Sequence, residues 1–177
     1  MQRPAANDDF PAAQTAQTAP IFRTLVLPVP RALAFELFTA HVHRWWSPVA
    51  GASPTGVPWA EIVLETQLNG RWFERDKEGA EHEWGRVASV VAPVHIVIDW
   101  CLNKRVQDVT TELELCFVEI DERSTRMTLE HRAFERLGSD GADVQDAIAH
   151  GWSGLLPRFA ALCRNAAAML ARTSHTD

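Results

Sequence analysis

The sequence predicts a two-layer α+β domain, in which one long helix covers one face of an antiparallel sheet. The middle of the chain, residues 60–132, reads as a series of short strands separated by turn residues. Several of these strands alternate apolar and polar side chains, which is typical of a sheet covered on one side only. Residues 143–171 carry apolar side chains at three- and four-residue steps, which is typical of an amphipathic helix. These patterns indicate one sheet packed against one long helix.

The first elements of the domain are short. A strand is expected over residues 21–27, where two prolines end it. A short amphipathic helix follows over residues 32–38, and a second short helical piece over residues 41–46. Residues 49–58 hold two Gly and two Pro and therefore predict a loop.

The predicted strands of the middle region are separated by polar turns, among which Asn69-Gly70 is a strong hairpin signal. These strands span residues 61–67, 71–75, 81–91, 95–102, 108–120 and 125–131. Alternation is clearest in the last two, whose expected inward positions include Leu113, Leu115, Phe117, Met127, Leu129 and His131.

We expect a single folded domain over residues 21–172, with no internal repeat and no second domain. Residues 1–20 are rich in Ala, Pro, Gln and Thr and lack an apolar period, so they predict a disordered N-terminal tail. Residues 173–177 are expected to form a short C-terminal tail.

The charge and the cysteines exclude several classes of protein. A net charge of −6 argues against nucleic-acid binding, which needs clustered Lys and Arg, and against an anionic membrane surface. No apolar run reaches the roughly 18–20 residues of a membrane span, and the N-terminus lacks the pattern of a signal peptide. Cys101, Cys116 and Cys163 are widely spaced, which fits reduced thiols and no metal-site spacing. We therefore expect a cytoplasmic protein with no metal ion and no other cofactor.

The aromatic composition points to an unusual interior. The chain has seven Trp, eight Phe and no Tyr. Tryptophan brings a large apolar area and a single hydrogen-bond donor. A domain of this size with so many tryptophans has either a very aromatic core or an aromatic-lined cavity.

Several motifs along the chain resemble one protein family. They are Leu25–Pro30, Ala34–Thr39, Arg44–Ser47, Gly70–Glu74, Trp84–Val87 leading through Pro93 to Trp100, His131–Phe134 and Gly151-Trp152. Over residues 22–170 the chain resembles the bacterial domains named after the activator of heat-shock protein 90 ATPase. These belong to the SRPBCC superfamily, together with START lipid-transfer domains and the birch pollen allergen. Asn69 stands where the family commonly has Gly, and Asn also tolerates left-handed backbone geometry.

The resemblance implies a helix-grip fold. A strongly curved antiparallel sheet of about six or seven strands would wrap the long C-terminal helix, with two short helices after the first strand and a hydrophobic cavity between sheet and helix. Members of the superfamily bind lipids, sterols, plant metabolites or polyketides, and some are cyclases or ring-modifying enzymes. Bacterial members need not bind the chaperone.

No catalytic or metal-binding signature accompanies these motifs. His41 and His43 are two residues apart, which places them on different faces of a helix. The run Gly151-Trp152-Ser153-Gly154 differs from a nucleophile elbow and lies inside the predicted helix. No residue is therefore assigned a catalytic role.

The polar residues of the strands are open to two interpretations. His131 shares a strand face with Met127 and Leu129, so it is either a satisfied core histidine or a polar anchor for a ligand. The faces occupied by Glu65, Glu74 and Arg86 stay open, because their strands lack clean alternation.

Aromatic and aliphatic walls with few polar groups are what small-molecule pockets are made of. The candidate ligand-binding residues are Trp46, Trp72, Trp84, Trp100, Leu115, Phe117, Met127, His131, Trp152 and Leu156. For each aromatic residue, a plain core role is the competing interpretation. Since Trp45 and Trp46 are neighbours on a helix, we expect one to close the cavity mouth and the other to pack elsewhere.

Three functions compete. The leading one is a protein that binds a small apolar or aromatic ligand in the cavity. The second is a polyketide cyclase-like or dehydratase-like enzyme, which two facing titratable groups in the cavity would favour. The third is a co-chaperone-like interaction module, which would need an exposed apolar patch. The lack of catalytic motifs favours a binding protein over an enzyme, and a homodimer through an edge strand or the long helix stays open.

Overall fold

The computed structural model describes residues 19–46, 59–101 and 109–173. Most of the predicted N-terminal tail, the whole predicted loop over residues 49–58 and most of the predicted C-terminal tail lie outside these ranges. The elements are β1 (Ile21–Leu27), α1 (Arg31–Thr39), η1 (Val42–Arg44), β2 (Trp59–Leu64), β3 (Arg71–Asp76), β4 (Glu81–Val91), β5 (His95–Trp100), β6 (Thr111–Asp121), β7 (Ser124–Arg132), η2 (Phe134–Asp140) and α2 (Gly141–Thr173).

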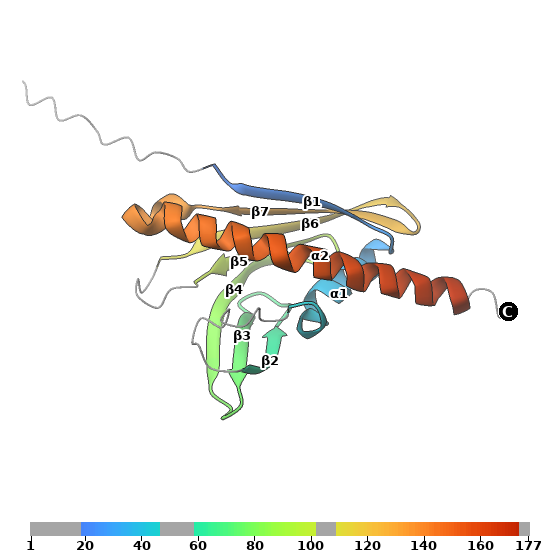
Figure 1. Cartoon of the computed structure of the whole chain (residues 1–177), viewed down its shortest axis with the longest axis horizontal. Helices are drawn as coiled ribbons and strands as arrows, with labels where there is room; N and C mark the ends of the chain where they lie inside the picture. Colours follow the sequence, from blue (N-terminus) through green and yellow to red (C-terminus); the bar gives the residue numbers. More distant parts are fainter. Residues whose placement is uncertain (1–18, 47–58, 102–108, 174–177) are drawn as a thin grey trace, which may run out of the picture.

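The strands form one antiparallel seven-stranded sheet in the order β1-β7-β6-β5-β4-β3-β2. Figure 1 shows α2 running across the part of the sheet formed by β1, β7, β6 and β5, while the hairpin of β3 and β4 projects away from the helix. The short helices α1 and η1 follow β1. This arrangement confirms the helix-grip fold, with a curved sheet holding the long helix on its concave face.

The burial of alternate residues follows from strand geometry. In β6, Leu113, Leu115 and Phe117 are fully buried, while the residues between them are half-exposed. The buried set meets the stripe of α2 that carries Trp152, Leu156, Phe159, Leu162 and Cys163. Pro157 lies inside this helix on its exposed side.

Two local features differ from the sequence prediction. The second helical piece is only the 3-10 turn η1, three residues long. The helix η2 was not predicted, because it depends on the left-handed backbone of Ala133, with φ 67°, and no local signal marks an alanine for that conformation.

A bulge interrupts the pairing of β3 with β4. Trp72 pairs with Gly85 and Phe73 with Glu83, so Trp84 has no partner of its own in β3. A bulge re-aims the side chains next to it. Gly85 is required there because a Cβ at this position would lie 2.6 Å from the carbonyl oxygen of Asp99. The bulge lets Trp72 and Trp84, on neighbouring strands, both turn into the concave face.

Truncating the ring of Phe159 should destabilise the fold. This side chain is fully buried, with its ring centroid 5.1 Å from Phe38 and 5.3 Å from Trp45. Phe159→Ala should lower the free energy of unfolding, measured by urea denaturation, by about 3–5 kcal/mol. Met169→Ala, at a 60% exposed position on the same helix, is the control and should change it by less than about 0.5 kcal/mol. Equal effects of the two substitutions would contradict the packing described here.

Candidate functional site

Six tryptophans gather on the concave face, and the ring of Trp46 contacts the other five, including its neighbour Trp45 at 5.5 Å. The centroid of its ring is 5.0 Å from Trp72, 5.2 Å from Trp84, 5.5 Å from Trp152 and 6.0 Å from Trp100. All four contacts are tilted or edge-to-face, the geometry that aromatic pairs prefer. We call Trp46, Trp72, Trp84, Trp100 and Trp152 the tryptophan cluster.

The sixth tryptophan, Trp45, differs from Trp46 in its burial. Trp45 is buried between Phe38 and Phe159, and its indole N–H donates to the carbonyl of Phe38 at 3.3 Å. Trp46 is only half-buried. Trp45 is therefore a core residue, while Trp46 packs against the other tryptophans and stays partly exposed.

Hydrogen bonding within the tryptophan cluster is incomplete. The indole N–H groups of Trp72, Trp84 and Trp100 are buried and have no hydrogen-bond partner among the described residues. A buried donor left unsatisfied costs about 1–3 kcal/mol. The cluster therefore presents donors but lacks the acceptors that would match them.

His131, in contrast, is fully satisfied. The indole N–H of Trp152 points at its Nδ1 over 3.3 Å, and its Nε2 lies 2.8 Å from the Thr111 hydroxyl. Indole can only donate, so Nδ1 accepts and the ring proton is on Nε2, which donates to Thr111. The Thr111 hydroxyl then donates to the carbonyl of Trp100 at 3.4 Å. The geometry supports the interpretation of His131 as a satisfied core histidine.

Burial also keeps His131 neutral. Its side chain is completely buried, and desolvation lowers its pKa from 6.5 to about 3. Protonation would place a second donor opposite the indole of Trp152 and break that hydrogen bond.

The remaining predicted site residues lie in the core. Phe117 packs edge-on against Phe35 at 5.5 Å and Phe38 at 6.1 Å, beneath α1 and apart from the tryptophan cluster. The other three are buried in the same hydrophobic core, and they are Leu115, Met127 and Leu156. The structure thus brings together the five tryptophans of the cluster and His131.

The charged candidates separate onto opposite faces of the sheet. Glu65 accepts from the backbone N–H and the guanidinium of Arg71, which lower the pKa of its carboxyl group. Arg86 pairs with Glu83 at 2.8 Å on the same outer face. Glu74 is 1% exposed, and it lies opposite the buried Ile62 in the register of β2 and β3. Of these three candidates, Glu74 alone belongs to the concave side.

Sequence reasoning missed His82 and Asp76. The Nε2 atom of His82 lies 3.1 Å from Oδ2 of Asp76, across the turn between β3 and β4. His82 is the register partner of Glu74 and therefore shares its face. The signal that could have found them is their position: Asp76 and His82 lie on either side of the predicted polar turn, where the two strands of a hairpin come close.

A second polar group lies on the convex face. Ligand atoms of His95, Glu114 and Cys116 lie within 4.8 Å of one another, close enough for a metal ion. Glu114 is already bound to His95 at 2.9 Å and to Arg132 at 2.6 Å, and these contacts, Arg132 foremost, lower the pKa of its carboxyl group. We interpret this group as an ion-pair network.

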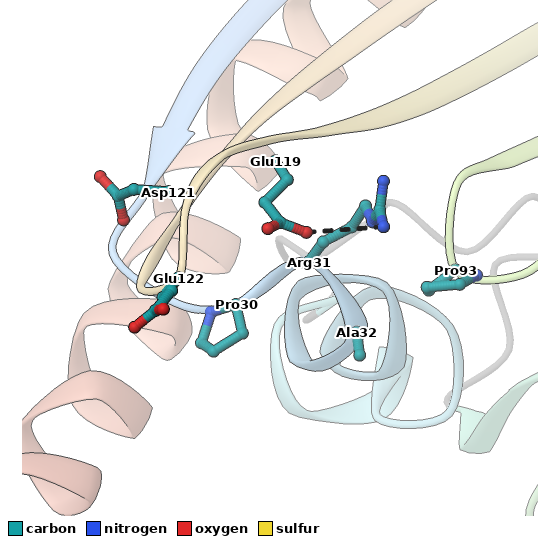
Figure 2. Close-up of a pocket in the computed structure, with 7 residues that line it drawn as sticks. All are labelled: Pro30, Arg31, Ala32, Pro93, Glu119, Asp121 and Glu122. Atoms are coloured by element: carbon teal, nitrogen blue, oxygen red, sulfur yellow. Dashed lines mark ion pairs between the residues drawn. The ribbon is translucent and has the colours of Figure 1, made fainter.

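A surface hollow of about 280 Å³ lies where α1 begins, beside the turn between β6 and β7. Figure 2 shows Glu119 paired with Arg31 at its edge, over 3.5 Å. The lining residues are Pro30, Arg31, Ala32, Pro93, Glu119, Asp121 and Glu122, none of which is a predicted ligand-binding residue. Among the described residues, no helix is long and apolar enough to cross a membrane.

The neutral state of His131 should make stability fall in acid. Below pH 6.5 the unfolded chain binds this proton while the folded protein does not until about pH 3, so the free energy of unfolding decreases as pH falls through that window. Urea denaturation at pH 7 and pH 4.5 should show that wild type loses about 3 kcal/mol more than His131→Gln, which cannot titrate. Parallel acid dependence of the two proteins would contradict this assignment.

Comparisons with known proteins agree with the fold. No curated protein matches the sequence. The self-sacrificing resistance protein CalC from Micromonospora echinospora is 27% identical, with a TM-score of 0.63 over 82% of this chain and 94% of CalC. The anthrahydroquino-gamma-pyrone synthase Txn09 is 24% identical, with a TM-score of 0.57 over 81% of this chain and 96% of Txn09.

An HSP90 activator from Plasmodium falciparum shares the fold at 15% identity, with a TM-score of 0.58 over 81% of this chain and 94% of that protein. The sequence also matches the family described as activator of Hsp90 ATPase homolog 1-like protein over residues 28–164. Because this match spans most of the chain, the protein belongs to the family of activator of Hsp90 ATPase homolog 1-like proteins.

Proposed function

We propose that this protein binds a planar aromatic small molecule that carries acceptor oxygens, at the tryptophan cluster on its concave face. The observation that carries the proposal is the set of three buried indole donors without partners among the described residues, on Trp72, Trp84 and Trp100. Carbonyl, pyrone or ether oxygens on a ligand would satisfy these donors. A purely aliphatic ligand would leave them unpaired.

The ring of Trp46 marks where such a ligand would lie. Trp46 is half-buried, and its ring contacts the four other members of the cluster. A planar ligand that takes its place would make similar aromatic contacts, each worth about 0.5–1.5 kcal/mol beyond the area buried. The Trp46 side chain would move outward to admit it.

The relatives are compatible with this proposal. Txn09 is named an anthrahydroquino-gamma-pyrone synthase, and a pyrone is a planar ring that carries acceptor oxygens. CalC, at 27% identity, is named a resistance protein. We further infer a cytoplasmic location, because all three cysteines are free thiols.

Flavone, a planar pyrone, should quench the tryptophan fluorescence saturably after correction for its own absorption, whereas palmitate and cholesterol should not. Trp100→Phe removes one unpaired donor but keeps an aromatic ring, and it should weaken flavone binding about five- to tenfold, since a neutral hydrogen bond contributes roughly 1 kcal/mol.

Trp45→Phe is the matched control, because the indole N–H of Trp45 is already bound to Phe38. It should lower stability while leaving flavone affinity within about twofold, because phenylalanine keeps an aromatic ring against Trp46. A fluorescence signal that flavone leaves unchanged, together with purified protein that carries no small molecule in native mass spectrometry, would refute the proposed function.

A further inference from the structure

The histidine at the start of β4 is held by a carboxylate. Asp76 closes β3, and its Oδ1 accepts the backbone N–H groups of Glu78 at 3.0 Å and Ala80 at 2.8 Å. Its other oxygen, Oδ2, lies 3.1 Å from Nε2 of His82. The hydrogen bond from His82 is the largest cause that lowers the pKa of Asp76, so the carboxylate is charged and can only accept. The turn therefore fixes the carboxylate, and the carboxylate fixes the imidazole.

This contact determines the tautomer of His82. Since a carboxylate accepts, Nε2 must carry a proton, and in the neutral imidazole Nδ1 then carries the lone pair. The Nδ1 atom is buried and has no hydrogen-bond partner among the described residues. An oriented imidazole with a vacant basic nitrogen is the arrangement of a general base.

The vacant nitrogen belongs to the face that carries the tryptophan cluster. His82 is two residues before Trp84 on the same strand and opposite the buried Glu74 on β3, which is itself two residues beyond Trp72. Residues two apart on a strand share a face, and directly opposed side chains have Cβ atoms roughly 4.5–5.5 Å apart. His82 and Glu74 thus share the face of Trp84 and Trp72, two residues further toward the turn between β3 and β4.

We propose that Asp76 and His82 form an acid–base centre that enolises a carbonyl compound bound at the tryptophan cluster, with Nδ1 of His82 as the base. This inference rests on the proposed function. In the forward step the C–H bond next to the carbonyl breaks, its proton goes to Nδ1, its electron pair forms the enolate double bond, and the carbonyl π pair moves onto oxygen. The reverse step returns a proton from Nδ1 to carbon. His82 is the catalytic residue, and Asp76 is a positioning residue.

The chemistry of the surrounding groups suits each stage of this step. The imidazolium that forms is stabilised by the Asp76 carboxylate, and the enolate oxygen can accept from the unpaired indole donors of the cluster. His131 cannot serve as the base, because Trp152 and Thr111 occupy both of its ring nitrogens.

The test is run in D₂O with 2-tetralone, a ketone fused to a benzene ring whose C1 hydrogens are acidic because they lie between the ring and the carbonyl. Proton NMR follows the replacement of its C1 hydrogens by deuterium, and fluorescence quenching in the same samples reports binding. Wild type should accelerate exchange about a hundredfold over buffer. His95→Gln, on the convex face, is the control and should exchange at the wild-type rate.

Two variants separate chemistry from folding. His82→Gln removes the base. Asp76→Asn keeps an oxygen to accept from Glu78 and Ala80, but its amide donates to Nε2 and moves the imidazole proton to Nδ1. Both should lower the exchange rate at least about tenfold while 2-tetralone still quenches fluorescence, and free imidazole should restore exchange in His82→Gln and not in Asp76→Asn.

The outcomes distinguish this inference from the proposed function. Quenching with exchange at the buffer rate, or exchange that survives both variants, would overturn the acid–base centre and leave the binding function standing. Absence of quenching by 2-tetralone and by flavone would overturn both.

Discussion

One hydrogen-bonded chain ties the layers of this fold together. Trp152 on α2 donates to His131 on β7, which donates to Thr111 on β6, which donates to the carbonyl of Trp100 on β5. Each link fixes the direction of the next, because indole can only donate and the buried histidine stays neutral. The position of α2 over the sheet, and with it the place of two members of the tryptophan cluster, depends on this chain.

Much of the fold was readable from the sequence because its signals are local and periodic. Alternation located β6 and β7, and the apolar stripe located α2, since each element buries one face. The tryptophan cluster was predictable as a set of candidate residues, but its arrangement was not. It depends on the bulge at Trp84 and Gly85, which no local pattern announces, and on edge-to-face contacts between residues far apart in the chain.

The two concave-face histidines show where sequence reasoning stops. The alternation of apolar and polar residues in β7 placed His131 on the inward face, yet both of its ring nitrogens have hydrogen-bond partners. His82 lies at the start of β4, a strand without clear alternation. Its chemical role is visible only in the structure, where Asp76 contacts one ring nitrogen and the other is buried without a partner among the described residues. Whether a histidine nitrogen has a hydrogen-bond partner depends on three-dimensional packing. The sequence alone therefore could not distinguish His82, with its unpaired nitrogen, from the fully bonded His131.

The donor-only character of the cluster has a further consequence for what could occupy it. An indole N–H only donates a hydrogen bond, so a ligand whose edge carries carbonyl oxygens can satisfy all three unpaired indoles. A ligand with phenolic hydroxyl groups also brings hydrogen-bond donors, and the indoles offer these donors no acceptor. For one and the same ring system the cluster would therefore bind the quinone more tightly than the hydroquinone. The affinity of this site would then depend on the oxidation state of the ligand.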